Sequence, residues 1–173
     1  MNIHYRKLLP TDSKQYREVR LDALKNFPEN FGSSYEEESA IPKLAFEINV
    51  EQGANDKFIV GAFDSETLIG ICGFAQESRI KIKHRGLIIQ MYIKPQYQGQ
   101  KLGLQLLQTT IDEAFKIPDI QQLVLGVITT NEGAKKLYEQ AGFKEFGIHP
   151  GYLKVNSRYY DERLMVLFRK SNL

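Results

Sequence analysis

A chain of 173 residues with 42% hydrophobic and 25% charged residues has the composition of a globular domain with its own core, so we expect one domain over residues 1–173. The formal net charge of +2, without a basic stripe interleaved with aromatics, argues against a nucleic-acid-binding protein. No apolar run approaches the roughly 20 residues that span a membrane, and the polar start MNIHYRKLLP lacks a signal peptide's apolar core. We therefore expect a cytoplasmic protein, with the single Cys72 buried as a small apolar side chain.

The first half of the chain predicts a strand, two helices and a β-hairpin. In chain order we expect a strand at 3–8, a helix capped by Thr11 or Asp12 and ending near Leu24, a loop at 27–39, a helix starting at Ser39 to Pro42 and ending near Gly53, and strands at 57–64 and 68–76. Serine, threonine and aspartate cap helix starts, and proline suits the first helical position. The turn at 65–67 is short enough for the two strands to pair as a hairpin.

The stretch from Leu87 to Phe115 predicts a buried strand, a glycine-containing turn and an amphipathic helix. Residues 87–93 are apolar except for Gln90, which is typical of a strand buried on both faces. A turn between a strand and a helix amino terminus exposes unsatisfied N–H groups at the positive end of the helix dipole, which suits an anion, most often a phosphate. Alternatively, Gly99 and Gly103 only make an ordinary strand-to-helix connection.

The remaining elements complete a mixed sheet. We expect a strand at 122–129, a helix at 131–141, and closing strands at 143–148 and 159–168, separated by a turn at His149 to Gly151 and a polar loop. The order of elements, β-α-α-β-β-β-α-β-α-β-β, predicts an α/β domain of mixed α+β type with helices covering the sheet.

Two motifs in this order resemble the signatures of the GNAT superfamily of N-acyltransferases. Gln98 to Gly103, QGQKLG, resembles [Q/R]-x-x-G-x-[G/A], the pyrophosphate-binding loop that holds acyl-coenzyme A in that family. Lys101 departs from it, because the family usually has its first glycine there; a positive φ at Lys101 would strain the loop, and a helical backbone would cost little. Asn131 to Phe143 matches the second signature, N-x-x-A-x-x-L-Y-x-x-x-G-F, position for position.

The resemblance implies the GNAT acyltransferase fold, a mixed, mostly antiparallel seven-stranded sheet with one parallel, splayed pair, flanked by about four helices. The gap between the splayed strands, 87–93 and 122–129, would receive the pantetheine arm of acetyl-CoA. The implied contacts to acetyl-CoA are Met91, Tyr92, Ile93, Gln98, Gly99, Gln100, Lys101, Leu102, Gly103 and Asn131. Tyr138 is the implied general acid that protonates the departing thiolate, and no metal is implied.

The implied activity is transfer of an acetyl group from acetyl-CoA to a primary amine of a small molecule, by direct attack in a ternary complex. Aromatic and acidic residues in the loops suit a cationic amine, and the candidate acceptor contacts are Phe31, Tyr35, Gln90 and Tyr160. Two alternatives are acetylation of a protein amino terminus or lysine, and a CoA-binding sensor without catalysis. We expect no nucleic-acid or membrane partner; family members often form homodimers, so a homodimer is one assembly to test.

The general base is left open by the residues. Many relatives place a carboxylate on the central strand, where this chain has Gln90, and an amide cannot take a proton. Other candidates are His84, Glu36, Glu37, Glu38, Asp161 and Glu162, with proton loss through water as an alternative.

Overall fold

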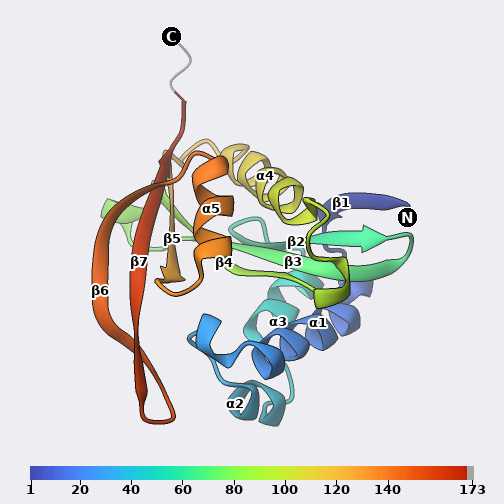
Figure 1. Cartoon of the computed structure of the whole chain (residues 1–173). Helices are drawn as coiled ribbons and strands as arrows, with labels where there is room; N and C mark the ends of the chain where they lie inside the picture. Colours follow the sequence, from blue (N-terminus) through green and yellow to red (C-terminus); the bar gives the residue numbers. More distant parts are fainter. Residues whose placement is uncertain (171–173) are drawn as a thin grey trace.

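A seven-stranded mixed sheet organises the chain in the computed structural model, which describes residues 1–170 (Figure 1). The strands follow the order β1-β2-β3-β4-β5-β7-β6, and the β4–β5 pair is parallel among antiparallel neighbours. The strands are β1 (Ile3–Lys7), β2 (Lys57–Asp64), β3 (Thr67–Gln76), β4 (Arg85–Ile93), β5 (Gln122–Ile128), β6 (Lys144–Val155) and β7 (Arg158–Phe168). The α-helices are α1 (Ser13–Asn26), α2 (Tyr35–Ala40), α3 (Ala45–Gln52), α4 (Leu102–Phe115) and α5 (Glu132–Gln140).

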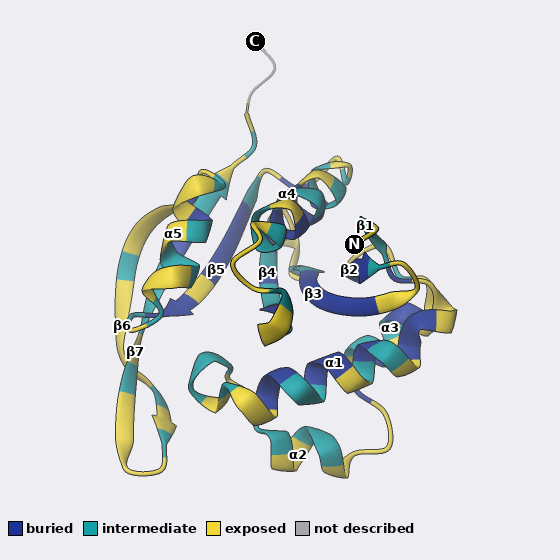
Figure 2. Cartoon of the chain, turned by 45° about the vertical axis from the view of Figure 1, so that its right-hand side comes forward, coloured by how far each residue is buried: buried dark blue, intermediate teal, exposed yellow. Residues whose placement is uncertain are grey.

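The two faces of the sheet carry separate hydrophobic cores, because successive side chains of a strand point to opposite faces. In β2, Ile59 and Phe63 pack with α1 and α3 on one face. Val60 and Ala62 belong to the other core, where α4 packs on β2. The centres of β2 and β3 are therefore buried almost throughout, as the dark ribbon of Figure 2 shows. The uninterrupted apolar runs in the sequence follow from this two-sided cover.

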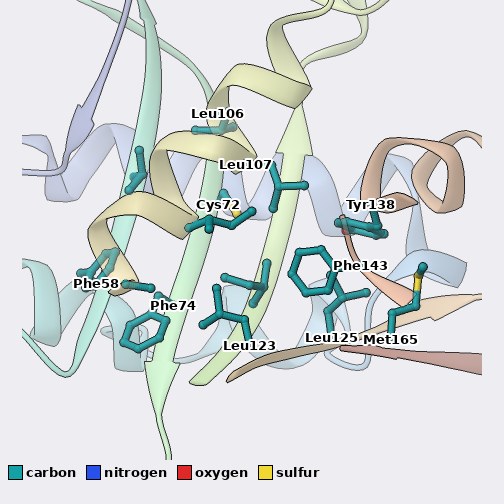
Figure 3. Packing of buried hydrophobic residues seen from close by; sticks show 14 of the residues in the cluster. Phe58, Cys72, Phe74, Leu106, Leu107, Leu123, Leu125, Tyr138, Phe143 and Met165 are labelled. Atoms are coloured by element: carbon teal, nitrogen blue, oxygen red, sulfur yellow. The ribbon is translucent and has the colours of Figure 1, made fainter. Parts of the chain in front are cut away.

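The core beside α4 also contains Cys72, which lies among Leu106, Leu107 and other apolar side chains (Figure 3). Burial raises the pKa of the Cys72 thiol to about 12, so the thiol stays protonated. Its interpretation as a buried small side chain is confirmed. Among residues 1–170 no helix is long and apolar enough to cross a lipid bilayer.

The segment between α1 and β2 folds into two short helices, where the sequence predicted a loop and one helix. Ser34 caps α2, because its hydroxyl accepts a 3.1 Å hydrogen bond from the Glu37 N–H. The expected start of a helix at Ser39 to Pro42 is wrong, since Ile41 is extended and α3 begins only at Ala45. The three consecutive glutamates, which lie within the expected loop, instead occupy the first turn of α2, where negative charge is favourable.

The closing hairpin is longer than predicted. The turn expected at His149 to Gly151 is wrong, because β6 continues through Pro150 and Gly151 to Val155. The pairing of β6 with β7 shifts register between His149 and Leu153, and the chain reverses at Asn156, whose φ is +55°. β6 is the last strand in the sheet order, so Pro150 removes no donor that a further strand would need.

The parallel strands β4 and β5 diverge soon after they begin. Within the described residues their pairing covers only Arg85 to Leu87 against Gln122 to Val124, although β4 continues to Ile93. On its other side β4 contains a β-bulge, since Ile71 pairs with Tyr92 but Gly73 pairs with Ile89. The splayed parallel pair expected from the sequence is therefore present.

Candidate active site

A cavity of about 740 Å³ opens where β4 and β5 diverge. Its walls are the second half of β4, the end of β5, the amino-terminal turn of α4 and one face of α5. Of the expected cofactor contacts, those that line it are Met91, Tyr92, Ile93, Gln98, Gly99, Lys101, Leu102, Gly103 and Asn131. The lining also contains Tyr138, Gln90 and Phe31. The predicted residues outside the lining are Gln100, Tyr35 and Tyr160.

The β4 wall offers backbone groups for an extended ligand. Beyond Leu87, the residues that the structure describes provide β4 with no paired strand on the β5 side. Exposed N–H and C=O groups of this kind bind an extended molecule as if it were another strand. The bulge lies at the same place, and Gln90 there has a φ of +55°, which is unusual for a residue with a side chain. A bulge leaves its extra residue out of the regular ladder and bends the strand, here beside the cavity.

The turn from β4 into α4 has the backbone geometry of an anion-binding loop. Gly99 and Lys101 have φ values of +77° and +61°. Lys101 caps α4 without a side-chain hydrogen bond, which leaves the first N–H groups of the helix available to a ligand. Gln98 fixes the loop to the end of β4, because its Nε2 donates a 2.8 Å hydrogen bond to the Ile93 carbonyl.

The positive φ at Lys101 decides between the two conformations that the sequence left open. A left-handed backbone costs a non-glycine residue about 1 kcal/mol or more, so the loop carries strain where a glycine would carry little. Gly103, by contrast, is helical, and a Cβ there would lie 2.9 Å from Leu137 Cδ1. Gly103 therefore permits close packing of α4 on α5 in addition to lining the cavity.

The helix α5 contributes Asn131 and Tyr138 to the cavity. Asn131 caps the helix, since its side-chain oxygen accepts a 3.0 Å hydrogen bond from the Ala134 N–H. Tyr138 is buried and meets Phe143 edge-on, with ring centroids 6.1 Å apart (Figure 3). Burial, with a smaller contribution from Cys72, raises the pKa of Tyr138. The phenol is thus protonated at neutral pH and can donate a proton into the cavity.

The acceptor side of the cavity is formed by the helical turn η2 (Pro28–Asn30) and its neighbours. Phe27, Asn30 and Phe31 line the cavity from this segment, which also contacts β5 and β6. Tyr35 is instead on α2, where Lys25 Nζ lies 5.9 Å from its ring centroid. Tyr160 on β7 lies under Arg158, whose Cζ is 5.0 Å from that ring centroid.

Most of the candidate bases either accept hydrogen bonds from other groups of the protein or are exposed to solvent. Glu38 forms two hydrogen bonds to the buried Arg20, of 2.9 and 3.0 Å. Asp161 accepts a 2.7 Å hydrogen bond from the Gly151 N–H. The exposed candidates are His84, Glu36 and Glu37. Glu162 differs from all of these, since its carboxylate packs against Gly126 in the cavity wall.

Two site features were absent from the sequence-based prediction. Tyr16 of α1 is buried, and its hydroxyl donates a 2.8 Å hydrogen bond to Gln90 Oε1. Gly126 is exposed in an otherwise buried strand and lines the cavity. An isolated glycine within an apolar strand is a signal for close approach of another group, so Gly126 was detectable in principle. No local sequence pattern indicates the contact between Tyr16 and Gln90, which are 74 residues apart.

The family model described as the acetyltransferase (GNAT) family matches residues 17–143. A spermidine N(1)-acetyltransferase from Vibrio cholerae is 26% identical over 143 residues, which cover 83% of this chain and 80% of that protein. N-alpha-acetyltransferase RimI from Mycobacterium tuberculosis is 30% identical over 115 residues, covering 66% of this chain and 68% of that protein. The similar proteins thus include one named for spermidine and one named for N-alpha-acetylation.

Solved structures show the same fold. A GNAT-family acetyltransferase from Streptococcus pneumoniae has a TM-score of 0.84 at 20% identity, covering 97% of this chain and 100% of that chain. An acetyltransferase from Salmonella typhimurium, described with its cofactor acetyl-CoA, has a TM-score of 0.81 at 18% identity, covering 100% of this chain and 97% of that chain. The seven-stranded sheet and its splayed parallel pair therefore belong to a known architecture.

Proposed function

The chain belongs to the GNAT acetyltransferase family and is an acetyl-CoA-dependent N-acetyltransferase, and we propose that its acceptor is a primary amine of a small molecule. The observation that carries the proposal is the acceptor side of the cavity, where Phe27 and Phe31 line the wall. Aromatic rings attract an ammonium group through their negative faces. The relative named for spermidine supports the same chemical class.

The cavity fits acetyl-CoA as the co-substrate. The loop from Gln98 to Lys101 and the start of α4 present N–H groups suited to a pyrophosphate. The unpaired edge of β4 suits an extended arm, with backbone groups of Met91 and Ile93 as the partners we assign. An N–H group at the bulge would also stabilise negative charge that develops on the thioester oxygen during attack.

Tyr138 is the general acid in this proposal. Its hydroxyl is kept protonated by burial, and it lines the cavity opposite β4. A positioned phenol that donates a proton to a departing thiolate lowers the barrier to cleavage of the C–S bond. Direct attack by the amine needs the two substrates held together, which a single cavity with an apolar acceptor side provides.

A protein amino terminus is the second candidate acceptor. The similarity to an N-alpha-acetyltransferase over 66% of the chain favours it. A peptide acceptor needs room for a chain on the acceptor side, whereas η2 contacts both β5 and β6 there. The cytoplasmic location expected from the sequence stays a prediction, and the homodimer suggested by the family resemblance stays an assembly to test.

Release of free CoA thiol from acetyl-CoA, measured across polyamines, amino acids, aminoglycosides and short peptides, tests the proposal. We expect turnover on small amines and little on short peptides. For the comparison, the peptides carry as their amino-terminal residue one of the amino acids tested. Acetyl-CoA binding measured in parallel separates an inactive preparation from a wrong acceptor class. Turnover restricted to peptides would contradict the small-molecule acceptor.

A further inference from the structure

A carboxylate lies beside the acceptor side of the cavity, on β7. Glu162 pairs with Ile128 of β5 and with His149 of β6, so its position is fixed by strands on both sides. Its side chain runs across β5 to Gly126, where a Cβ would overlap Oε1 and Cδ of Glu162. Gly126 is exposed and lines the cavity. The missing side chain at Gly126 therefore makes room for a carboxylate at the cavity wall.

The Glu162 carboxylate has no protein partner within residues 1–170, where none of the side-chain hydrogen bonds or ion pairs involves it. Its neighbours along β7 are engaged, Asp161 with the Gly151 N–H and Arg163 with Glu145. Carboxylates that are partly buried are usually paired, because desolvation penalises the charged form. A carboxylate left without a partner beside a cavity is a candidate to bind a cationic ligand.

The surroundings of Glu162 favour proton uptake. Burial raises its pKa, and the nearby His149 acts in the opposite direction. The titratable groups around it are His149 and Tyr152 of β6 and Tyr160, two residues earlier in β7; the facing residues of β5 carry none. A carboxylate with a raised pKa is a better proton acceptor than one at its ordinary value, provided that it is ionised at the working pH.

Gln90 cannot take this role. The Tyr16 hydroxyl donates to its Oε1, so the amide presents N–H donors to the rest of the cavity. An amide neither accepts a proton from an ammonium nor offsets its charge. Gln90 therefore leaves the role of base to another group, and β7 is the strand that brings a carboxylate to the wall.

We propose that Glu162 binds the ammonium group of the acceptor and takes one of its protons. This inference rests on the proposed small-amine acceptor. The lone pair that is freed forms the C–N bond to the thioester carbonyl carbon, and the C–S bond breaks. Tyr138 gives its proton to the departing thiolate, and the second proton lost by the nitrogen restores the phenol. Glu162 releases its proton to water, so one proton is released per acetyl group transferred to an ammonium.

The test compares Glu162→Gln with Glu139→Gln, which removes the same charge from an exposed position of α5 outside the cavity lining. With an amine identified by thiol release, we expect Glu162→Gln to lower kcat/KM by about 10²-fold or more and to abolish the acidic limb of its pH profile. The Kd for acetyl-CoA should be unchanged and the melting temperature not lowered, since an unpaired, partly desolvated carboxylate does not stabilise the fold. Glu139→Gln should match the wild type in all four measurements.

An acidic limb that persists in Glu162→Gln, or a kcat/KM within about twofold of wild type, would overturn the inference. A fall in melting temperature together with activity would assign Glu162 a structural role and overturn it as well. Gly126→Ala, which displaces the carboxylate, should reproduce the kinetic loss and add little to it in the double variant.

A readout without turnover separates this inference from the choice of acceptor. The NMR resonance of the Glu162 carboxyl carbon can be assigned by its loss in Glu162→Gln. Its pH titration is then followed in the presence of CoA, without an amine and with spermidine, 1-butylamine or glycinamide. We expect a raised pKa for Glu162 that falls when an amine binds, because the ammonium stabilises the carboxylate. If the wild type acetylates no amine, the proposed function fails, whereas no response of Glu162 to any of the three probes overturns the present inference.

Discussion

The Tyr16 hydroxyl donates a 2.8 Å hydrogen bond to Oε1 of Gln90, joining helix α1 to the bulge of β4 across 74 residues of sequence. Tyr16 is fully buried, and Gln90 lies at the cavity. The bond fixes the amide with its N–H groups turned away from the phenol. The central strand therefore offers a neutral hydrogen-bond donor and no carboxylate at this position.

Removing this bond should cost stability and acceptor affinity together. Tyr16→Phe leaves Gln90 Oε1 without its donor, and we expect the free energy of unfolding to fall by about 1 kcal/mol. Loss of the fixed amide should raise KM for the acceptor more than the Kd for acetyl-CoA. Urea denaturation and steady-state kinetics measure both effects. Tyr5→Phe is the control, because Tyr5 forms no side-chain hydrogen bond within the described residues, and an equal loss in both variants would contradict the role of the bond.

Tyr138→Phe should lower turnover by about 10²-fold while the Kd for acetyl-CoA stays within about twofold of wild type. The physical reason is that the variant keeps the ring packed on Phe143 but removes the proton that burial holds on the phenol. Assays of CoA thiol release give the turnover, and calorimetric titration gives the Kd for acetyl-CoA. Unchanged turnover would remove Tyr138 from the proton transfer.

Lys101→Gly should raise stability and weaken cofactor binding. Glycine relieves the left-handed backbone at φ +61°, so we expect a gain of about 1 kcal/mol in the free energy of unfolding. Loss of the ammonium should raise the Kd for CoA several-fold at low salt and reduce its salt dependence. Lys136→Gln, on the exposed face of α5, is the control for charge. Equal affinity and salt dependence in wild type and Lys101→Gly would show that the ammonium meets no phosphate.

The Arg20–Glu38 pair should make stability depend on pH. Burial by itself would raise the pKa of Glu38, but hydrogen bonds and the charge of Arg20 hold that pKa below its ordinary value of 4.5. A depressed pKa means that the stabilisation is present above about pH 4.5 and is lost as the pH falls through the folded-state pKa. Glu38→Gln should lower the free energy of unfolding by about 2 kcal/mol at pH 7, because Arg20 stays buried without its partner.

Urea denaturation at pH 7 and pH 3.5 measures this effect. In Glu38→Gln the difference between the two pH values should shrink. Glu36→Gln, in the same helix but exposed, should change stability by less than about 0.5 kcal/mol at either pH. Similar losses of unfolding free energy in the two variants would show that the Arg20–Glu38 pair is not the source of the pH dependence.

The two signatures predicted residues that line the cavity because each signature is a local unit. Gln98 to Gly103 joins β4 to α4, and Asn131 to Phe143 spans α5, so the residues within each signature are neighbours in both sequence and space. Hydrophobic periodicity and caps likewise predicted most helices and strands, since both depend on interactions within about one helical turn or one strand. The long β6 was missed, because an edge position in the sheet, and not the local turn residues, lets it continue through Pro150 and Gly151.

The sequence by itself determined the succession of strands, the family and the loop and helix that line the cavity, because these depend on residues close together in the chain. Only the tertiary structure decided that Lys101 is left-handed, that Tyr16 holds Gln90, and that Glu162 lies over Gly126. The last two contacts join strands and helices that are distant in sequence. Their geometry follows from strand register and from packing across the sheet, which no local pattern encodes.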